Sequence, residues 1–281
     1  MKGIIALDID GTITNHHTHL QLEVRTFLKA LSEDWFVVFI SGRTFTWGYE
    51  VLQHLDFPYY LAVHNGAVVF HMPSKEIVLK TLVPVNSLPD IDLLFDDLLD
   101  DYILYPESEG QPICFYRPKR FSKGILNYFK GRSETFQEKW IPVEDFKNLP
   151  FEDFFALKYF GSFEHSLKVA SRLESKNLHA PIIKDPYDVD VYIIQATHCD
   201  VTKGSALEHL KSLLLPHGIT IAAGDDNNDA SMLAFADVKV VMATAPEYLL
   251  KIAHVIAPPA SEMGIISGLK DAINRVMQNG R

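Results

Sequence analysis

The stretch GIIALDIDGT, residues 3–12, decides the fold of this 281-residue chain. Gly3–Leu7 is an unbroken apolar run, which is typical of a β-strand buried on both faces of a parallel sheet. Two carboxylates, Asp8 and Asp10, follow at once, and Gly11 permits a tight turn. Ligands of parallel sheets bind beyond the carboxyl ends of the strands. We therefore interpret both aspartates as functional, because a helix cap needs only one such residue.

Further short apolar runs repeat this pattern at both ends of the chain. They are Trp35–Ile40, Tyr60–Val63, Ala67–Phe70, Ile219–Ala223, Val238–Met242 and His254–Ala257. Helix-like segments separate most of them, and the first has apolar residues at helical spacing between Leu22 and Leu31. Alternating strands and helices predict an α/β fold, in which helices cover both faces of a Rossmann-like parallel sheet.

The middle of the chain has a different character. From about residue 81 the strand-like runs are less purely apolar and prolines are frequent. We interpret residues 82–195 as an inserted α+β domain, which leaves a discontinuous core of residues 1–81 and 196–281. Within the insertion, Asp90–Tyr102 has apolar residues at helical spacing and predicts an amphipathic helix with its aspartates on a solvated face. A calcium site is disfavoured there, because no glycine-turned ligand loop is present.

The composition limits the functional classes. Hydrophobic residues make up 47% of the chain, enough for a packed core, and the formal net charge of −10 argues against a broad basic face for nucleic acid. Two cysteines, Cys114 and Cys199, are too few for a disulfide framework. The N-terminal apolar run is shorter than that of a signal peptide, and no stretch approaches the ~20 apolar residues of a membrane span. We expect a cytoplasmic protein with no membrane partner.

A second acidic motif lies far from the first in the sequence. The strand-like run Ile219–Ala223 leads into GDDNND, residues 224–229. If the two strands are neighbours, Asp8, Asp10 and Asp225 lie together at one edge of the sheet. Three carboxylates there would repel one another strongly without a cation. Oxygen ligands with no nearby cysteine or histidine cluster suit Mg²⁺ rather than Zn²⁺. An aspartate of the second motif could instead cap a helix, but capping does not explain its pairing with the first motif.

Two further motifs are suited to phosphate. A predicted strand ends at Ser41-Gly42-Arg43, where a hydroxyl and backbone N–H groups can hold phosphate oxygens. Lys203 lies just before a helix-like segment, where a cation is disfavoured unless an anion or a carboxylate cluster accompanies it. Alone, these features would be an ordinary turn and a solvent-facing lysine. Together with the two acidic motifs, they predict a phosphate site.

In this order, the four motifs resemble those of the haloacid dehalogenase (HAD) superfamily of phosphohydrolases. The resemblance extends to the Cof-type subfamily, whose large cap (of the C2B type) is inserted between the second and third motifs. Asn65-Gly66-Ala67 and Met263-Gly264-Ile265 fit further turns of that subfamily. The resemblance implies a HAD core with an inserted α+β cap. It also implies Mg²⁺-dependent hydrolysis of phosphomonoesters through an aspartyl-phosphate.

The resemblance further implies a role for each motif residue. The catalytic residues are Asp8 as nucleophile, Asp10 as general acid and base, and Lys203. The phosphate ligands are Ser41, Gly42, Lys203 and Asn228. The Mg²⁺ ligands are Asp8, Asp10 through its backbone carbonyl, and Asp225. Thr12 and Asp229 support these residues from a second layer.

The substrate implied is a small phosphorylated metabolite, such as a sugar phosphate or a nucleotide-like cofactor, and the chain is expected to be a monomer or a homodimer. A phosphomutase with the same nucleophile is the alternative enzyme, and a non-enzymatic phospho-receiver is the alternative from another class. In the insertion, Lys158 and Tyr187–Asp190 are candidates for substrate contact and equally for structural roles. Three histidines, His16, His17 and His19, are expected to be exposed rather than to bind metal.

Overall fold

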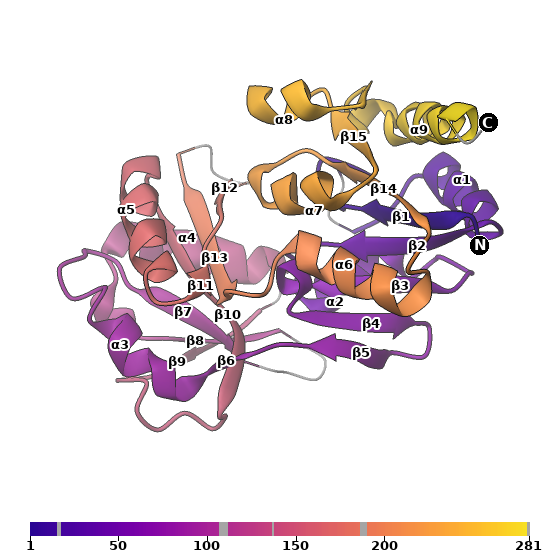
Figure 1. The fold of residues 1–281 in the computed structure, drawn as a ribbon. Helices are drawn as coiled ribbons and strands as arrows, with labels where there is room; N and C mark the ends of the chain where they lie inside the picture. Colours follow the sequence, from indigo (N-terminus) through magenta and orange to yellow (C-terminus); the bar gives the residue numbers. More distant parts are fainter. Residues whose placement is uncertain (16–17, 107–111, 137, 186–189, 280–281) are drawn as a thin grey trace. The chain divides into compact units, whose positions relative to one another are not determined.

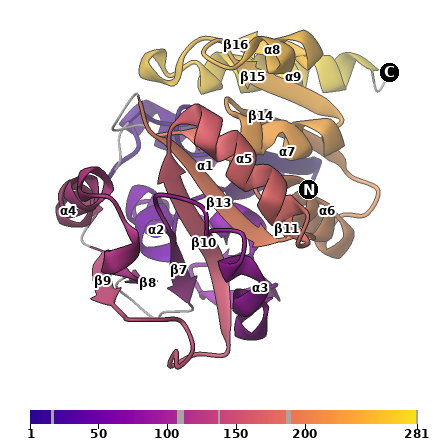
Figure 2. The ribbon, with the colours of Figure 1, turned by 90° about the vertical axis from the view of Figure 1, so that its left-hand side faces the viewer.

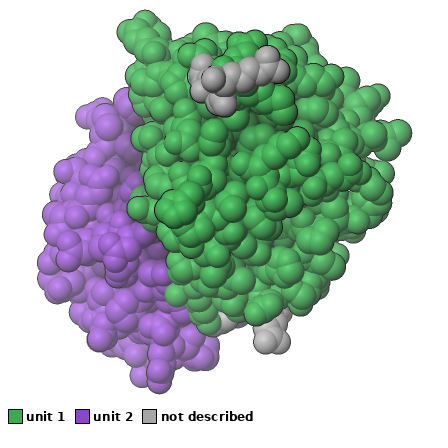
Figure 3. Space-filling model, turned by 45° about the vertical axis from the view of Figure 1, so that its right-hand side comes forward, with its two compact units in different colours: residues 1–80, 202–281 green, residues 81–201 purple. Residues whose placement is uncertain are grey.

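The computed structural model describes residues 1–15, 18–106, 112–136, 138–185 and 190–279. The chain divides into two compact units, one of residues 1–80 and 202–281 and the other of residues 81–201, which Figure 3 colours separately. Each unit has its own sheet and its own buried core.

An eight-stranded sheet forms the centre of the first unit (Figure 1). Its order is β16 (Val255–Ala257), β15 (Val238–Met242), β14 (Ile219–Gly224), β1 (Gly3–Leu7), β2 (Trp35–Ile40), β3 (Tyr59–Val63), β4 (Val68–Met72) and β5 (Glu76–Lys80). The strands from β16 to β3 run parallel, and β4 and β5 add an antiparallel edge. All residues of β1 are buried, because both of its edges are paired and both of its faces are covered.

Helices cover both faces of this sheet. One face packs against α6 (Lys203–Leu214), α7 (Ala230–Phe235) and α8 (Glu247–Ile252). The other face packs against α1 (Leu22–Ser32), α2 (Phe45–Leu52) and α9 (Ile265–Asn279). Short 3₁₀ turns are η1 (His64–Gly66), η4 (Asn227–Asp229) and η5 (Ala260–Glu262). The predicted α/β fold is therefore confirmed.

The strands predicted at both ends of the chain are all present; three match the predicted bounds, and the ends of the others differ by one or two residues. The turn predicted at Asn65-Gly66 is η1, which joins the antiparallel strands β3 and β4. β5 was not predicted, because this edge strand is largely exposed and its sequence EIVLK lacks a long apolar run.

The second unit is built on a mixed sheet with the order β11 (Leu178–His179), β13 (Tyr192–His198), β10 (Asp153–Gly161), β7 (Tyr102–Pro106), β8 (Ile113–Tyr116) and β9 (Lys139–Pro142). Two short strands pair beside it, β6 (Val83–Pro84) with β10 and β12 (Ile182–Lys184) with β13. On one face lie α3 (Leu88–Asp92) and α5 (Phe163–Glu174), and Figure 2 shows α5 lying across β13. The other face packs against α4 (Lys123–Phe136). Short 3₁₀ turns are η2 (Val85–Ser87) and η3 (Pro118–Arg120).

The helix predicted over Asp90–Tyr102 is wrong. α3 ends at Asp92, the chain continues through turns, and β7 begins at Tyr102. The aspartates do not form a common solvated face, because Asp101 is buried against the Arg117 guanidinium at 2.7 Å. Aspartate side chains compete with the helix backbone for hydrogen bonds, so apolar spacing alone did not make this segment a helix.

Candidate active site

The carboxyl ends of β1 and β14 bring the two acidic motifs together. The strands pair in parallel with Leu7 opposite Ala223, and the Asp8 N–H donates to the Ala223 carbonyl at 3.0 Å. Asp8 and Asp225 therefore leave neighbouring strands at the same edge of the sheet, which is where parallel sheets bind ligands.

The loop after β1 closes directly over Asp225. Gly11 has a φ of +73°, and a Cβ atom added there would lie 2.2 Å from the Asp225 Oδ2, so this position requires glycine. Thr12 is buried, and its hydroxyl donates to the Asp225 Oδ1 at 3.1 Å. These two residues fix the Asp225 carboxylate against the first motif.

A buried ammonium links the two acidic motifs. Lys203 is the first residue of α6, whose start is capped by Thr202 and Ser205. Its Nζ lies 2.5 Å from the Asp8 Oδ1 and 2.6 Å from the Asp229 Oδ1. The two carboxylates offset both the burial of this cation and its unfavourable place at the positive end of a helix.

Asp229 fixes the backbone conformation of the second acidic motif, GDDNND. Its Oδ2 accepts hydrogen bonds from the backbone N–H groups of Asp225, at 2.9 Å, and Asp226, at 3.0 Å. Asp226 in turn caps η4. The motif GDDNND thus forms a capped helix start and also supplies carboxylates next to Asp8. The capping and the ligand interpretations of its sequence are therefore compatible.

Carboxylates outnumber ammonium groups in this cluster. Oxygens of Asp8, Asp225 and Asp229 lie within 4.8 Å of one another. Burial raises the pKa of Asp8 to about 8 against the lowering effect of Lys203. Burial, with the charges of Asp8 and Asp229, also raises the pKa of Asp225 well above its ordinary value. Burial would lower the pKa of Lys203, but Asp229 and Asp8 outweigh it and raise that pKa overall, which keeps the amine protonated.

Asp10 faces the motif Ser41-Gly42-Arg43. The Nε and Nη2 atoms of Arg43 donate to its two carboxylate oxygens at 2.8 and 2.6 Å, which is a bidentate pair with defined geometry. Arg43 also donates to the Trp47 carbonyl at 2.9 Å. The Arg43 side chain is only 9% exposed, whereas that of Asp10 is 49% exposed. The Asp10 carboxylate is therefore accessible to solvent and to a ligand.

The loop Ser41–Arg43 follows β2, the strand beside β1, so it lies at the same sheet edge as Asp8. Ser41 is buried, and its Oγ accepts a hydrogen bond from the Arg43 N–H at 3.2 Å. A hydroxyl that accepts one bond can still donate its own hydrogen. Gly42, between them, adds no side chain to the loop.

Asn228 contacts a residue that we did not predict to belong to the site. Its Nδ2 donates to the Asn65 Oδ1 at 3.1 Å, and Asn65 is buried within η1. The available signal was the Asn-Gly pair, which we interpreted only as a turn. The ion pair of Arg43 with Asp10 was also not predicted, because no sequence pattern shows which carboxylate a guanidinium will meet.

The remaining candidate residues lie outside the four motifs. Lys158 is buried in the second unit, with its Nζ 4.5 Å from the centre of the Tyr105 ring. Residues 187–189 lie outside the described part of the chain, as do residues 16–17. His19 is exposed, as expected.

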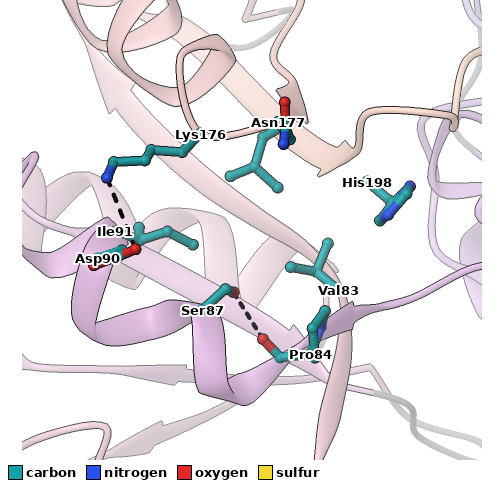
Figure 4. Close-up of a pocket in the computed structure, with 9 residues that line it drawn as sticks. Val83, Pro84, Ser87, Asp90, Ile91, Lys176, Asn177 and His198 are labelled. Atoms are coloured by element: carbon teal, nitrogen blue, oxygen red, sulfur yellow. Dashed lines mark hydrogen bonds and ion pairs between the residues drawn. The ribbon is translucent and has the colours of Figure 1, made fainter.

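The second unit also contains a small cavity of about 170 Å³ (Figure 4). Figure 4 shows the Lys176–Asp90 ion pair, 3.8 Å long, on one side and His198 on the other, with Val83 and Ile91 among the apolar lining. Ligand atoms of residues 198–200 (His, Cys and Asp) lie within 4.8 Å of one another. All of these residues lie outside the four motifs.

Comparison with known proteins agrees with the four motifs. Residues 5–269 match the family model of haloacid dehalogenase-like hydrolases. The chain is similar to the phosphatase YwpJ of Bacillus subtilis, with 25% identity over 95% of this chain and 98% of that protein. It is also similar to the 5-amino-6-(5-phospho-D-ribitylamino)uracil phosphatase YitU of the same organism, with 22% identity over 95% of this chain and 96% of that protein.

A solved structure shows the same fold. SMU.1108c from Streptococcus mutans UA159 aligns with a TM-score of 0.78 and 21% identity, over 98% of this chain and 100% of that chain. The family match spans both units, and the acidic cluster lies at the sheet edge where the four motifs converge. The chain therefore belongs to the haloacid dehalogenase-like hydrolases, a family in which the similar proteins from Bacillus subtilis are named as phosphatases.

Proposed function

We propose that this hydrolase is a Mg²⁺-dependent phosphatase that cleaves small phosphomonoesters through an aspartyl-phosphate on Asp8. The observation that supports this most is the buried contact of the Asp8 Oδ1 with the Lys203 ammonium at 2.5 Å, next to Asp225. A carboxylate held in this way has a fixed orientation, and we assign its other oxygen, Oδ2, as the attacking atom.

The acidic cluster fits Mg²⁺. Its three carboxylates and one ammonium carry two net negative charges when all are ionised, which a divalent cation offsets. The donors are oxygens, as Mg²⁺ prefers. We propose Asp8, Asp225 and the Asp10 backbone carbonyl as its ligands, with Asp229 behind them, since Asp229 already bonds Lys203 and two backbone N–H groups. Bound there, Mg²⁺ would neutralise negative charge on the phosphoryl oxygens.

The chain's own groups supply the bond changes. Asp8 Oδ2 bonds to phosphorus while the ester oxygen leaves with a proton from Asp10. Asp10 then takes a proton from water, whose oxygen bonds to phosphorus, and Asp8 is released as a carboxylate. The bidentate contact with Arg43 fixes the orientation of the Asp10 carboxyl group for both steps. The phosphoryl oxygens are assigned to Ser41, Gly42, Lys203 and Asn228.

The unit of residues 81–201 is the proposed selector of the leaving group, as the cap expected over residues 82–195. The four motifs all lie in the first unit, so the chemistry alone does not require the second. An inserted domain of this size favours a small metabolite over a folded phosphoprotein. The similarity to YitU, which is named for a phosphorylated ribityl compound, supports a sugar phosphate or a nucleotide-like cofactor phosphate as the substrate class.

The proposed location is the cytoplasm. Cys114 and Cys199 are free thiols, as a reducing compartment maintains. A net charge of −10 disfavours nucleic acid as a partner. Across the described ranges, no helix has the length and apolar character that a bilayer span needs.

The variant Asp8→Asn tests the proposal, because an amide is a poor nucleophile. A panel of phosphorylated metabolites should release phosphate with the wild-type enzyme and Mg²⁺, and Asp8→Asn should abolish this without changing the circular dichroism spectrum. The matched control is Asp34→Asn, which removes an exposed ion pair with Lys2 and should keep full activity. Retention of more than a few per cent of activity by Asp8→Asn would rule out Asp8 as the nucleophile.

A further inference from the structure

The turn η1 has an unusual backbone. Three successive residues have left-handed torsions, with φ values of +50° at His64, +58° at Asn65 and +107° at Gly66. Two of them are not glycine, and such conformations persist only where the surrounding structure enforces them. Asparagine is among the residues that tolerate this region best. The turn is therefore held in a specific shape.

Contacts with two of the four motifs enforce that shape. The His64 N–H donates to the Arg43 carbonyl and the Asn65 N–H to the Ser41 carbonyl, both at 2.9 Å. A Cβ atom added at Gly66 would lie 2.9 Å from the Thr202 carbonyl oxygen, so the turn passes directly against the start of α6. η1 thus connects the loop that carries Ser41 with the helix that begins at the catalytic lysine.

The Asn65 side chain reaches a third motif. Its Oδ1 accepts the hydrogen bond from Asn228 Nδ2 at 3.1 Å, and the residue is 1% exposed. Its own Nδ2 is buried and has no hydrogen-bond partner among the described residues. A buried donor without an acceptor destabilises the folded state. Native structures keep such a donor chiefly where a ligand, an anion or a water molecule accepts its hydrogen bond.

We infer that Asn65 is a further phosphate-binding residue, which holds Asn228 through Oδ1 and donates from Nδ2 to an oxygen of the bound phosphoryl group. This inference rests on the proposed phosphatase function, since Ser41 and Asn228, the residues that Asn65 contacts, are both assigned there to the phosphoryl oxygens. A dianionic phosphate brings the acceptor that the buried Nδ2 lacks. A charge-assisted hydrogen bond of this kind is stronger than a neutral one.

Two substitutions separate the donor from the backbone conformation. Asn65→Asp keeps the shape, the tolerance of left-handed torsions and the acceptor for Asn228, but loses the Nδ2 donor. Asn65→Gly also tolerates the torsions and removes the whole side chain. The matched control is Asn177→Asp, because Asn177 has the same φ of +58° but is exposed in the second unit.

The readout is the dissociation constant of inorganic phosphate in the presence of Mg²⁺, measured by calorimetry on the full chain, together with the Mg²⁺ affinity without phosphate. Both Asn65 variants should bind phosphate about tenfold or more weakly, which corresponds to one lost charge-assisted bond. Their Mg²⁺ affinity should not change, because Asn65 is not among the proposed metal ligands. A merely structural defect would instead lower both affinities. Asn177→Asp should match the wild type in both.

Several outcomes would overturn the inference. If Asn65→Gly binds phosphate as tightly as the wild type, the donor is not used, even where Asn65→Asp is weakened by charge repulsion. Equal losses of Mg²⁺ and phosphate affinity in both variants would reduce Asn65 to a structural role. If the wild-type protein binds no phosphate and hydrolyses no phosphomonoester, the proposed function itself fails. If the wild type does both and the variants bind equally well, only the role of Asn65 fails.

Discussion

Replacing Lys203 with methionine should destabilise the metal-free protein strongly. The ammonium is 1% exposed and lies within 2.6 Å of both Asp8 and Asp229, so its removal leaves buried carboxylates without their partner. Breaking a buried ion pair from one side typically lowers the free energy of unfolding by about 3–5 kcal/mol. Methionine has a similar length and keeps the packing, so the loss reports on charge rather than on a cavity.

The loss should depend on pH. Burial already raises the pKa of Asp8 to about 8, and without Lys203 that pKa should rise further. A carboxyl group whose pKa is higher in the folded than in the unfolded state is not penalised below its unfolded pKa, and the penalty grows as the pH rises toward its folded pKa. Up to about pH 8 the wild type carries the same penalty for Asp8 as the variant, so the two proteins should be closest at low pH and differ most above about pH 8.

Urea unfolding, followed by circular dichroism in the presence of a chelator, measures both effects. The matched control is Lys211→Met in the same helix, because Lys211 forms a more exposed pair with Asp237 at 3.4 Å. That control should lose at most about 1 kcal/mol. If Lys203→Met loses no more than the control above pH 8, or loses most at low pH, the buried charges do not govern the stability of this site.

Three further predictions concern catalysis and the second unit. Asp10→Asn should slow turnover by ~10²–10⁴-fold, with larger losses for esters with poor leaving groups, as steady-state kinetics with an ester series will show. A chelator should abolish activity, Mg²⁺ should restore it and Ca²⁺ should restore little, because its longer bonds misplace the reacting groups. Burial, and then Arg132, lower the pKa of Lys158 from 10.5 to about 8, so the wild type should gain about 3 kcal/mol of unfolding free energy relative to Lys158→Met between pH 8 and 10.5. Equal pH profiles of urea unfolding for these two proteins would contradict the last prediction.

The centre of the parallel part of the first unit follows from the sequence because its strands are interior. β1, β2 and β14 have neighbours on both edges and helices on both faces, so nearly every position is apolar and the run is visible without any alignment. The edge strand β5 has exposed residues and gives no such signal. In the second unit, the apolar spacing of residues 90–102 matched a helix, but the long-range ion pair between Asp101 and Arg117 is not encoded in spacing.

Two members of the acidic cluster, Asp8 and Asp225, were predictable because each directly follows a buried strand, whereas the third carboxylate is that of Asp229 in η4 and not that of Asp10. Neighbouring parallel strands place such residues together, so the convergence of Asp8 and Asp225 needed only the strand order. Asn65 could not be found in this way, because the role that we propose for it depends on an unpaired donor and on a left-handed backbone at a position that also fits an ordinary turn. The orientation of Asp10 toward Arg43 depends on side-chain torsions, which no sequence pattern fixes.

The nucleophilic role of Asp8 is tested most directly by trapping the phosphorylated enzyme. Asp10→Asn should slow the hydrolysis of the intermediate, and an ester with a very good leaving group should still form it, because that step then needs no acid. Acid quenching during turnover, followed by peptide mass analysis, should find one phosphoryl group on the peptide that contains Asp8. The same experiment on the Asp8→Asn/Asp10→Asn double variant should find none. Phosphate release without any phosphorylated peptide, or a phosphoryl group on another residue, would contradict the mechanism.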